Sequence, residues 1–142
     1  MTKEIKLRSY GIIPVAMPES GEVEFLLLRA YKNWDFPKGG SDENELPVET
    51  ARREMTEETG IVDVEMLWGD LSKSTVVYGA GKVATYYLGQ VRKRSITLPI
   101  SEELGRPEHD EYRWVSYPEA KTLLPERLVD ILDWANSVIG TR

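Results

Sequence analysis

Residues 39–61 constrain this chain more than any other segment, because they combine an acidic cluster with helical periodicity. Glu54, Glu57 and Glu58 stand three and four positions apart, so a helix brings their carboxylates together on one turn. Like charges at this spacing destabilise an isolated helix by roughly a few tenths of a kcal/mol per pair. Because magnesium and manganese prefer oxygen ligands, the cluster indicates either a divalent-metal site or a solvated acidic helix face.

The same segment carries the signals of a helix that packs on a core. Val48, Ala51 and Met55 recur at spacings of three and four, which predicts a helix over roughly residues 46–59 with one apolar face. Gly60 follows the last periodic residue and is predicted to end the helix in a left-handed conformation. The acidic face is then left free for another role.

The complete spacing of this segment resembles the Nudix box, in which glycines, glutamates and an arginine stand at fixed intervals. Every fixed position is filled, by Gly39, Glu45, Arg53, Glu54, Met55, Glu57, Glu58, Gly60 and Ile61. The resemblance implies a loop, helix and loop that hold divalent metal against a diphosphate. It also implies an enzyme that hydrolyses nucleoside diphosphates linked to another group.

The resemblance assigns roles to individual positions of the box. The ligands that it implies for Mg²⁺, or alternatively Mn²⁺, are the carboxylates of Glu54, Glu57 and Glu58. A carbonyl near Lys38 or Gly39 would complete the metal's coordination, and Arg53 would orient the carboxylates through charge-assisted contacts. The catalytic base is left open, since it varies within the family.

Few residues are available for other hydrolytic mechanisms. The chain has one histidine and no cysteine, which excludes a Cys-His nucleophile pair. No signature of a covalent serine mechanism is recognisable either. The metal site that the resemblance implies favours attack by a metal-bound water, from which a nearby carboxylate removes a proton.

The segment before the box resembles one particular branch of the family. Residues 24–40, EFLLLRAYKNWDFPKGG, are similar to the asymmetrical diadenosine tetraphosphate hydrolase branch, where W-x-x-P-K-G leads into the box. Lys38 is expected to neutralise a nonbridging phosphate oxygen, the alternative being an exposed lysine in a turn. Trp34 and Phe36 are interpreted as core residues.

Two downstream segments resemble the same branch. Residues 107–115, PEHDEYRWV, match its E-H-x-x-Y-R-W run, which implies that Glu108 is a further metal ligand or base and that Tyr112 stacks on a nucleobase. His109 is left between a phosphate-contacting, catalytic role and a structural one. Residues 79–89, GAGKVATYYLG, match more loosely and make Lys82 a second phosphate candidate.

Tyr86 and Tyr87 alternate across the strand predicted for this last segment. Neighbouring residues of a strand face opposite sides of a sheet, so one tyrosine is expected in the core. Tyr86 is predicted to face the pocket as a base-stacking surface.

Two positions depart from the pattern of the branch. Asn44 takes the place of a glycine before Glu45, and asparagine tolerates a left-handed backbone better than most residues. Tyr10 replaces a small residue and is expected to reshape the nucleoside pocket.

Strand-like runs and helical patterns share the chain. Helices are predicted over the box, after Pro118 and from Pro125, and strands over residues 9–17, 23–30, 62–68, 74–78, 82–91 and 111–115. Strands mixed with three helices predict an α/β class, and the resemblance implies an α/β/α sandwich with a mixed β-sheet. The 142 residues are expected to form a single Nudix domain over residues 1–142.

Charge and hydropathy limit the partners of the chain. A net charge of −6 argues against a broad nucleic-acid surface. No apolar run approaches the roughly 20 residues of a membrane span, and the start MTKEIKLRSY lacks a signal-peptide pattern. A cytoplasmic monomer or small homo-oligomer is the expectation.

These observations favour a magnesium-dependent Nudix hydrolase of dinucleoside polyphosphates. Attack distant from one nucleoside would convert diadenosine tetraphosphate to ATP and AMP. Alternative substrates within the family are RNA 5′ triphosphate ends, diphosphoinositol polyphosphates and nucleoside triphosphates. Two other classes are a noncatalytic nucleotide-binding sensor, which the complete set of carboxylates disfavours, and a plain structural domain.

Overall fold

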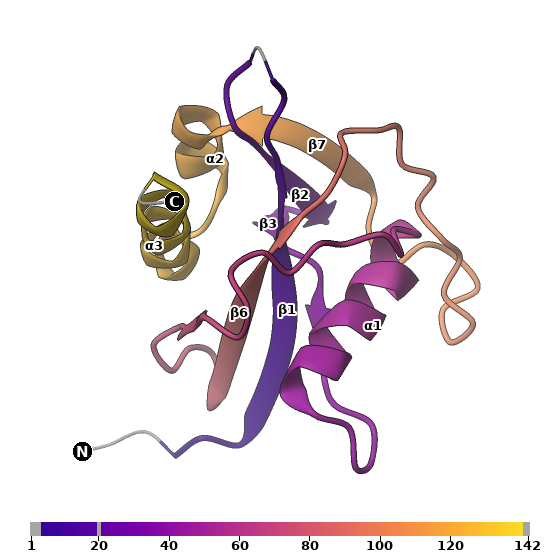
Figure 1. Cartoon of the computed structure of the whole chain (residues 1–142). Coiled ribbons are helices and arrows are strands. Elements are labelled where there is room, and N and C mark those ends of the chain that lie inside the picture. The colour runs from indigo at the N-terminus through magenta and orange to yellow at the C-terminus, as the bar shows by residue number, and fades with distance from the viewer. Residues whose placement is uncertain (1–3, 20, 141–142) are drawn as a thin grey trace.

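The computed structural model of the chain describes residues 4–19 and 21–140. Figure 1 shows a central sheet with α1 on one side and α2 and α3 on the other. The helices are α1 (Pro47–Thr59), α2 (Tyr117–Leu123) and α3 (Glu126–Gly140). The strands are β1 (Leu7–Ala16), β2 (Glu24–Ala30), β3 (Asn33–Asp35), β4 (Lys38–Gly39), β5 (Ser72–Ser74), β6 (Lys82–Gln90) and β7 (Glu111–Ser116).

The sheet is mixed because β1 runs parallel to β6 and antiparallel to β2. Its strand order is β3-β2-β1-β6-β5, and β4 also pairs with β1 while β7 pairs with β2. The parallel register extends from Leu7 opposite Lys82 to Val15 opposite Gln90. Parallel neighbours need a long crossover connection, and here that connection contains α1. The predicted α/β class with a mixed sheet and three helices is confirmed.

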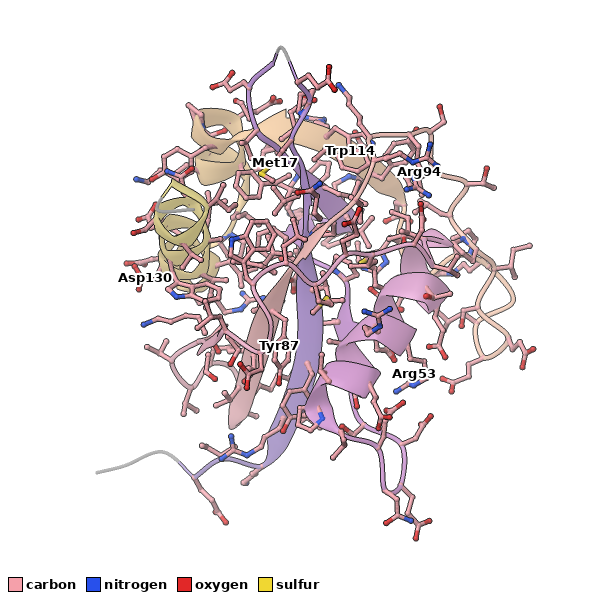
Figure 2. All side chains as sticks on the ribbon, viewed as in Figure 1. Met17, Arg53, Tyr87, Arg94, Trp114 and Asp130 are labelled. Carbon is pink, nitrogen blue, oxygen red and sulfur yellow. The ribbon has the colours of Figure 1, made fainter. Side chains whose placement is uncertain are left out.

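Alternating side chains of the central strands give the sheet two buried faces. Ile12 and Leu26 lie in one cluster with Met55 of α1. Ile13 lies in the other, which includes Leu128 of α3. Charged side chains such as Arg53 and Asp130 lie on the outer sides of the helices (Figure 2). The fold therefore buries the apolar stripe of α1, and of the three glutamates on its acidic turn only Glu57 is exposed.

The helix predicted over the box and the left-handed residue predicted at its end are confirmed. The helix predicted over residues 46–59 is observed as Pro47–Thr59, and Gly60 ends it in the left-handed region with φ 79°. Asn44 also adopts a positive φ, of 64°, as its side chain allows. Asn44 therefore keeps a left-handed backbone at the position where the branch has glycine.

Two predicted strands are wrong. Residues 62–68 contribute only one bridge, between Glu65 and Gln90, because the chain there crosses the end of β6. The strand predicted over residues 74–78 is displaced to Ser72–Ser74, since Gly79 and Gly81 with positive φ turn the chain back toward β6. The other predicted strands and helices are present, with ends shifted by one or two residues.

Within the described residues, no helix is both long and apolar enough to cross a membrane. Residues 1–3 of the charged N-terminal segment lie outside the described part of the chain.

Candidate active site

The helix α1 presents two chemically different faces because of its residue spacing. Ala51 and Met55 are fully buried against the sheet. The Glu57 side chain, on the other side, is 56% exposed. At the N-terminus the Glu49 carboxylate accepts a hydrogen bond from the Leu46 N–H at 2.9 Å, which stabilises the first turn. The packing of Ala51 and Met55 therefore places the acidic turn beside the core.

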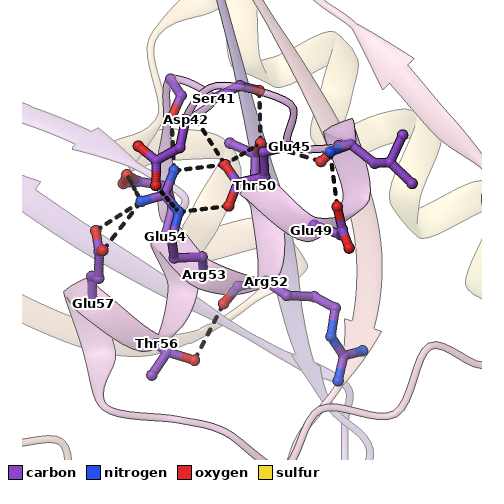
Figure 3. A network of polar contacts seen from close by, with 12 residues as sticks. Ser41, Asp42, Glu45, Glu49, Thr50, Arg52, Arg53, Glu54, Thr56 and Glu57 are labelled. Carbon is purple, nitrogen blue, oxygen red and sulfur yellow. Dashed lines mark hydrogen bonds and ion pairs between the residues drawn. The ribbon is translucent and has the colours of Figure 1, made fainter.

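Arg53 connects the carboxylates of α1 to the loop that precedes the helix (Figure 3). Its Nη1 donates to Oε1 of Glu54 at 3.0 Å and to both oxygens of Glu57 at 3.1 Å. Its Nε donates to Oε2 of Glu45 at 2.8 Å, and its Nη2 donates to the Gly40 carbonyl at 2.8 Å. One guanidinium thus fixes the relative positions of two acidic side chains and the loop.

The Arg53 guanidinium also changes the acidity of Glu45. Hydrogen bonds from Arg53, with further ones from the Asp42 N–H and the Thr50 hydroxyl, lower the pKa of Glu45 to about 2. Glu45 accordingly stays ionised at any ordinary pH and holds Arg53 in place. Glu45, the first fixed glutamate of the box, is therefore a structural partner of Arg53.

The short strand β4 brings backbone from the preceding loop against α1. Lys38 and Gly39 pair with Gly11 and Tyr10 of β1. The Lys38 N–H donates to Oε1 of Glu58 at 3.3 Å. A Cβ added at Gly39 would overlap the carboxylate of Glu54, so only glycine fits there without displacing that side chain.

Glu58 and Glu54 lie in surroundings that oppose their negative charge. The Glu58 side chain is only 4% exposed. Burial, followed by the charges of Glu108 and Glu54, raises the pKa of Glu58. Burial and the charge of Glu57 raise the pKa of Glu54. A cation bound between these carboxylates would offset the repulsion and keep both ionised.

A third segment, the turn before β7, adds donors to this turn of α1. Glu58, Glu108 and His109 each offer one ligand atom, and these atoms lie within 4.8 Å of one another. Two carboxylates and an imidazole make an oxygen-rich donor set of net negative charge, which fits a hard divalent cation. The residues present are therefore able to hold a metal.

His109 faces this site instead of solvent. Its side chain is 11% exposed, and its Nε2 lies 3.9 Å from Oε1 of Glu58. Burial lowers the pKa of His109, so the ring is neutral at physiological pH. Its buried Nδ1 has no hydrogen-bond partner within the described part of the chain. A neutral ring with an unsatisfied nitrogen suits a polar ligand in the adjoining space.

These side chains line one cavity of about 760 Å³. It brings together most of the residues singled out from the sequence, namely Lys38, Gly39, Glu54, Glu57, Glu58, Glu108 and His109. Its other wall is made by residues 98–104 of the long connection between β6 and β7. No role for that wall was predicted from the sequence, because its short run of mixed residues matches none of the motifs that indicate the site.

Four sequence-predicted site residues lie outside the cavity lining, namely Arg53, Lys82, Tyr86 and Tyr112. The prediction that Tyr86 offers a stacking face is wrong: its side chain is fully buried, and its hydroxyl donates to Oδ1 of Asp35 at 2.7 Å. Tyr87 lies on the opposite face of the sheet, as alternation predicted. Lys82 starts β6, opposite Leu7, and the fold does not bring it to the carboxylates.

Tyr112 is half-buried on β7, opposite Leu28 of β2. It packs against the cluster under α1, together with Tyr10. Neither ring is part of the cavity lining among the described residues. Trp34 and Phe36 are core residues, as predicted, with 8% and 1% of their surfaces exposed.

The sequence model of the NUDIX domain matches residues 6–135, nearly the whole chain. The chain belongs to the Nudix hydrolase family. The box helix of this Nudix hydrolase is α1, and the carboxylates that the fold gathers around it come from the box and from the turn before β7.

Known proteins similar to this Nudix hydrolase include two kinds of enzyme. A bis(5′-nucleosyl)-tetraphosphatase [asymmetrical] of Rattus norvegicus is 35% identical over 125 residues, which cover 80% of this chain and 82% of the relative. An RNA pyrophosphohydrolase of Bartonella henselae is 33% identical over 102 residues, covering 61% of this chain and 58% of the relative. The crystal structure of a C. elegans Ap4A hydrolase binary complex superposes with a TM-score of 0.80 at 21% identity, covering 96% of this chain and 100% of that one. That likeness concerns the fold.

Proposed function

We propose that this Nudix hydrolase is a Mg²⁺-dependent hydrolase of dinucleoside polyphosphates. The observation that carries the proposal is the meeting of Glu54, Glu57, Glu58 and Glu108 with Lys38 in one cavity. Carboxylates supply ligands for a hard cation, and the lysine supplies a positive charge for a phosphate oxygen. Both are needed to hold a phosphoanhydride in place for attack by water.

The proposed ligands of the metal are Glu54, Glu57, Glu58 and Glu108, with the backbone near Lys38 and Gly39. A bound Mg²⁺ would neutralise phosphate charge and make a water more acidic. Arg53 positions Glu54 and Glu57 through its hydrogen bonds. The Lys38 ammonium would contact a nonbridging oxygen, and His109 would present a neutral ring to the substrate.

The substrate class is proposed from the segments that surround the box. The run leading to Lys38 and the run from Glu108 to Trp114 resemble the asymmetrical diadenosine tetraphosphate hydrolases. The asymmetrical bis(5′-nucleosyl)-tetraphosphatase of Rattus norvegicus is 35% identical over most of both chains. We therefore propose diadenosine tetraphosphate as a substrate, with ATP and AMP as products.

The first test is incubation of the pure protein with diadenosine tetraphosphate and Mg²⁺, with an EDTA control and chromatographic separation of products. Equal amounts of ATP and AMP support the proposal. Two ADP per substrate would mean attack at the central linkage and would contradict the proposed position of cleavage. Absence of Mg²⁺-dependent turnover would contradict the substrate.

A second candidate is the 5′ triphosphate end of RNA, which the similarity to an RNA pyrophosphohydrolase favours. Lys38 argues against it, because the RNA-end branch often carries glutamine at this place of the motif. A short 5′-triphosphorylated RNA in the same assay separates the two substrates. Faster release of pyrophosphate from that RNA than turnover of diadenosine tetraphosphate would reverse the order of the candidates.

A further inference from the structure

The cavity has two chemically different walls. One wall carries the carboxylates of α1 and Lys38. The other is formed by residues 98–104, which pass beside α1 in Figure 1 and contribute Leu98, Ile100 and Leu104. Ile100 and Leu104 are 71% and 50% exposed. Large apolar side chains exposed inside a polar cavity indicate contact with an apolar part of a ligand.

The backbone holds this second wall in a defined shape. The Ser101 N–H donates to the Arg106 carbonyl at 3.0 Å, and the Gly105 N–H donates back to the Ser101 carbonyl at 2.8 Å. Ile100 is bridged to Pro107, and Gly105 turns the chain with a φ of 69°. The apolar side chains therefore stand on a closed turn whose geometry does not depend on them.

The charges on this wall exclude additional phosphates. Glu102 and Glu103 lie on it, and Lys38, on the opposite wall, is the single Lys or Arg among the described residues that line the cavity. A phosphate group near residues 98–104 would meet two carboxylates and no cation. The part of a substrate that reaches this wall must be uncharged and partly apolar.

We propose that residues 98–104 form a nucleobase platform, on which Ile100 and Leu104 contact the face of a base whose phosphates lie at α1. The proposal rests on the proposed function, because it specifies the nucleoside end of the same substrate. A base is flat, uncharged and apolar on its faces, and its N–H groups tolerate the neighbouring carboxylates. The platform disfavours diphosphoinositol polyphosphates, whose rings carry phosphates in place of a base.

The test measures binding, so that it does not depend on turnover. Calorimetric affinities are compared for adenosine 5′-(α,β-methylene)diphosphate and for methylenediphosphonate in the presence of Mg²⁺. The first probe has a base and the second has none, and both resist hydrolysis. The variants are Ile100→Ala/Leu104→Ala and, as a matched control, Leu71→Ala, whose leucine is 51% exposed outside the cavity lining.

The wild-type protein is expected to bind the nucleotide probe more tightly than the base-free probe. The double variant should lose roughly tenfold in affinity for the nucleotide probe, as expected for lost apolar contact, and none for methylenediphosphonate. Leu71→Ala should change neither affinity. In a second variant, Ile100→Tyr, a larger face should increase affinity for the nucleotide probe several-fold.

Three results would overturn the platform: equal wild-type affinities for the two probes, unchanged nucleotide binding in the double variant, or an equal loss for both probes. A protein that binds the nucleotide through Ile100 and Leu104 but does not cleave diadenosine tetraphosphate would contradict the proposed substrate alone. The two proposals therefore fail separately.

Discussion

Gly39 lies directly against the carboxylate of Glu54, so that a Cβ at position 39 would overlap that carboxylate. The contact arises because β4 pairs with β1 and so holds the Gly39 backbone against α1. A glycine at this place sets the distance between a backbone segment and an acidic side chain that we propose as a metal ligand.

Gly39→Ala is expected to lower turnover by roughly 100-fold while the protein stays folded. The added methyl group meets only the end of a flexible side chain, so Glu54 must move, and displacement of a catalytic group by about 1 Å can cost that much. The measurement is the rate with diadenosine tetraphosphate and Mg²⁺. The matched control is Gly40→Ala, since a Cβ at Gly40 meets nothing within 4 Å. Equal rates for the two variants would contradict the role of this contact.

Glu57→Gln is expected to lower turnover by roughly 100- to 1,000-fold, the range seen when one electrostatic group of an active site is removed. The Glu57 side chain is 56% exposed, so the loss of its charge should change the free energy of unfolding little. Steady-state kinetics and a thermal melt separate the two effects. Glu43→Gln, at an exposed glutamate in the preceding loop, is the control. A near-normal rate for Glu57→Gln would remove Glu57 from the proposed metal site.

The accuracy of the sequence-based predictions follows the range of the interactions involved. Residues 46–59 and Gly60 were predictable because helical spacing and a left-handed terminal glycine are local properties. The left-handed Asn44 was predictable for the same reason. These elements carry the carboxylates, so the acidic half of the cavity was foreseen.

The parts that were not predictable depend on packing between distant segments. Alternation correctly divided Tyr86 and Tyr87 between two faces, but which face meets the pocket is decided by α3, which covers Tyr86. Lys82 is excluded from the cavity by the register of β6 on β1. The wall of residues 98–104 is held by turn hydrogen bonds that leave no periodic pattern in the sequence.

Stability should depend on the ionisation of Glu45 in acid. Hydrogen bonds from Arg53, the Asp42 N–H and the Thr50 hydroxyl lower the pKa of Glu45 from 4.5 to about 2 in the folded state. The folded state therefore binds the proton of Glu45 less well than the unfolded chain does, and this stabilisation is present above the unfolded pKa. It is lost as the pH falls from about 4.5 through about 2.

Glu45→Gln should remove this component of the acid dependence. The measurement is the free energy of unfolding in denaturant across that acid range, for the wild type, Glu45→Gln and the control Glu43→Gln. The wild type and the control should lose stability toward low pH more steeply than Glu45→Gln. Identical slopes for all three proteins would show that the hydrogen bonds to Glu45 do not favour its ionised form in the folded state.

Tyr86→Phe is expected to destabilise the fold by about 1–3 kcal/mol, because it leaves a buried carboxylate without one of its donors. The Tyr86 hydroxyl donates to Oδ1 of Asp35 at 2.7 Å, and the Asp35 side chain is only 15% exposed. Burial raises the pKa of Asp35, whereas the hydrogen bond from Tyr86 favours the ionised form and lowers that pKa. The loss in free energy of unfolding should therefore be largest above the folded-state pKa of Asp35, where Asp35 is ionised, and smaller in acid.

The control for Tyr86→Phe is Tyr117→Phe, which removes a hydroxyl that donates to Oδ1 of Asp133 at 2.6 Å. The Asp133 side chain is 41% exposed, so water can replace the lost donor. We expect a loss of about 0.5–1 kcal/mol there, with little dependence on pH. Denaturant unfolding of both variants at neutral and acidic pH gives the comparison.

If Tyr86→Phe cost no more than Tyr117→Phe at neutral pH, burial of Asp35 would not make its hydrogen bond to Tyr86 important for stability. The tyrosine would then serve the fold through its ring alone, which packs edge-on against Phe36 with 5.6 Å between ring centroids.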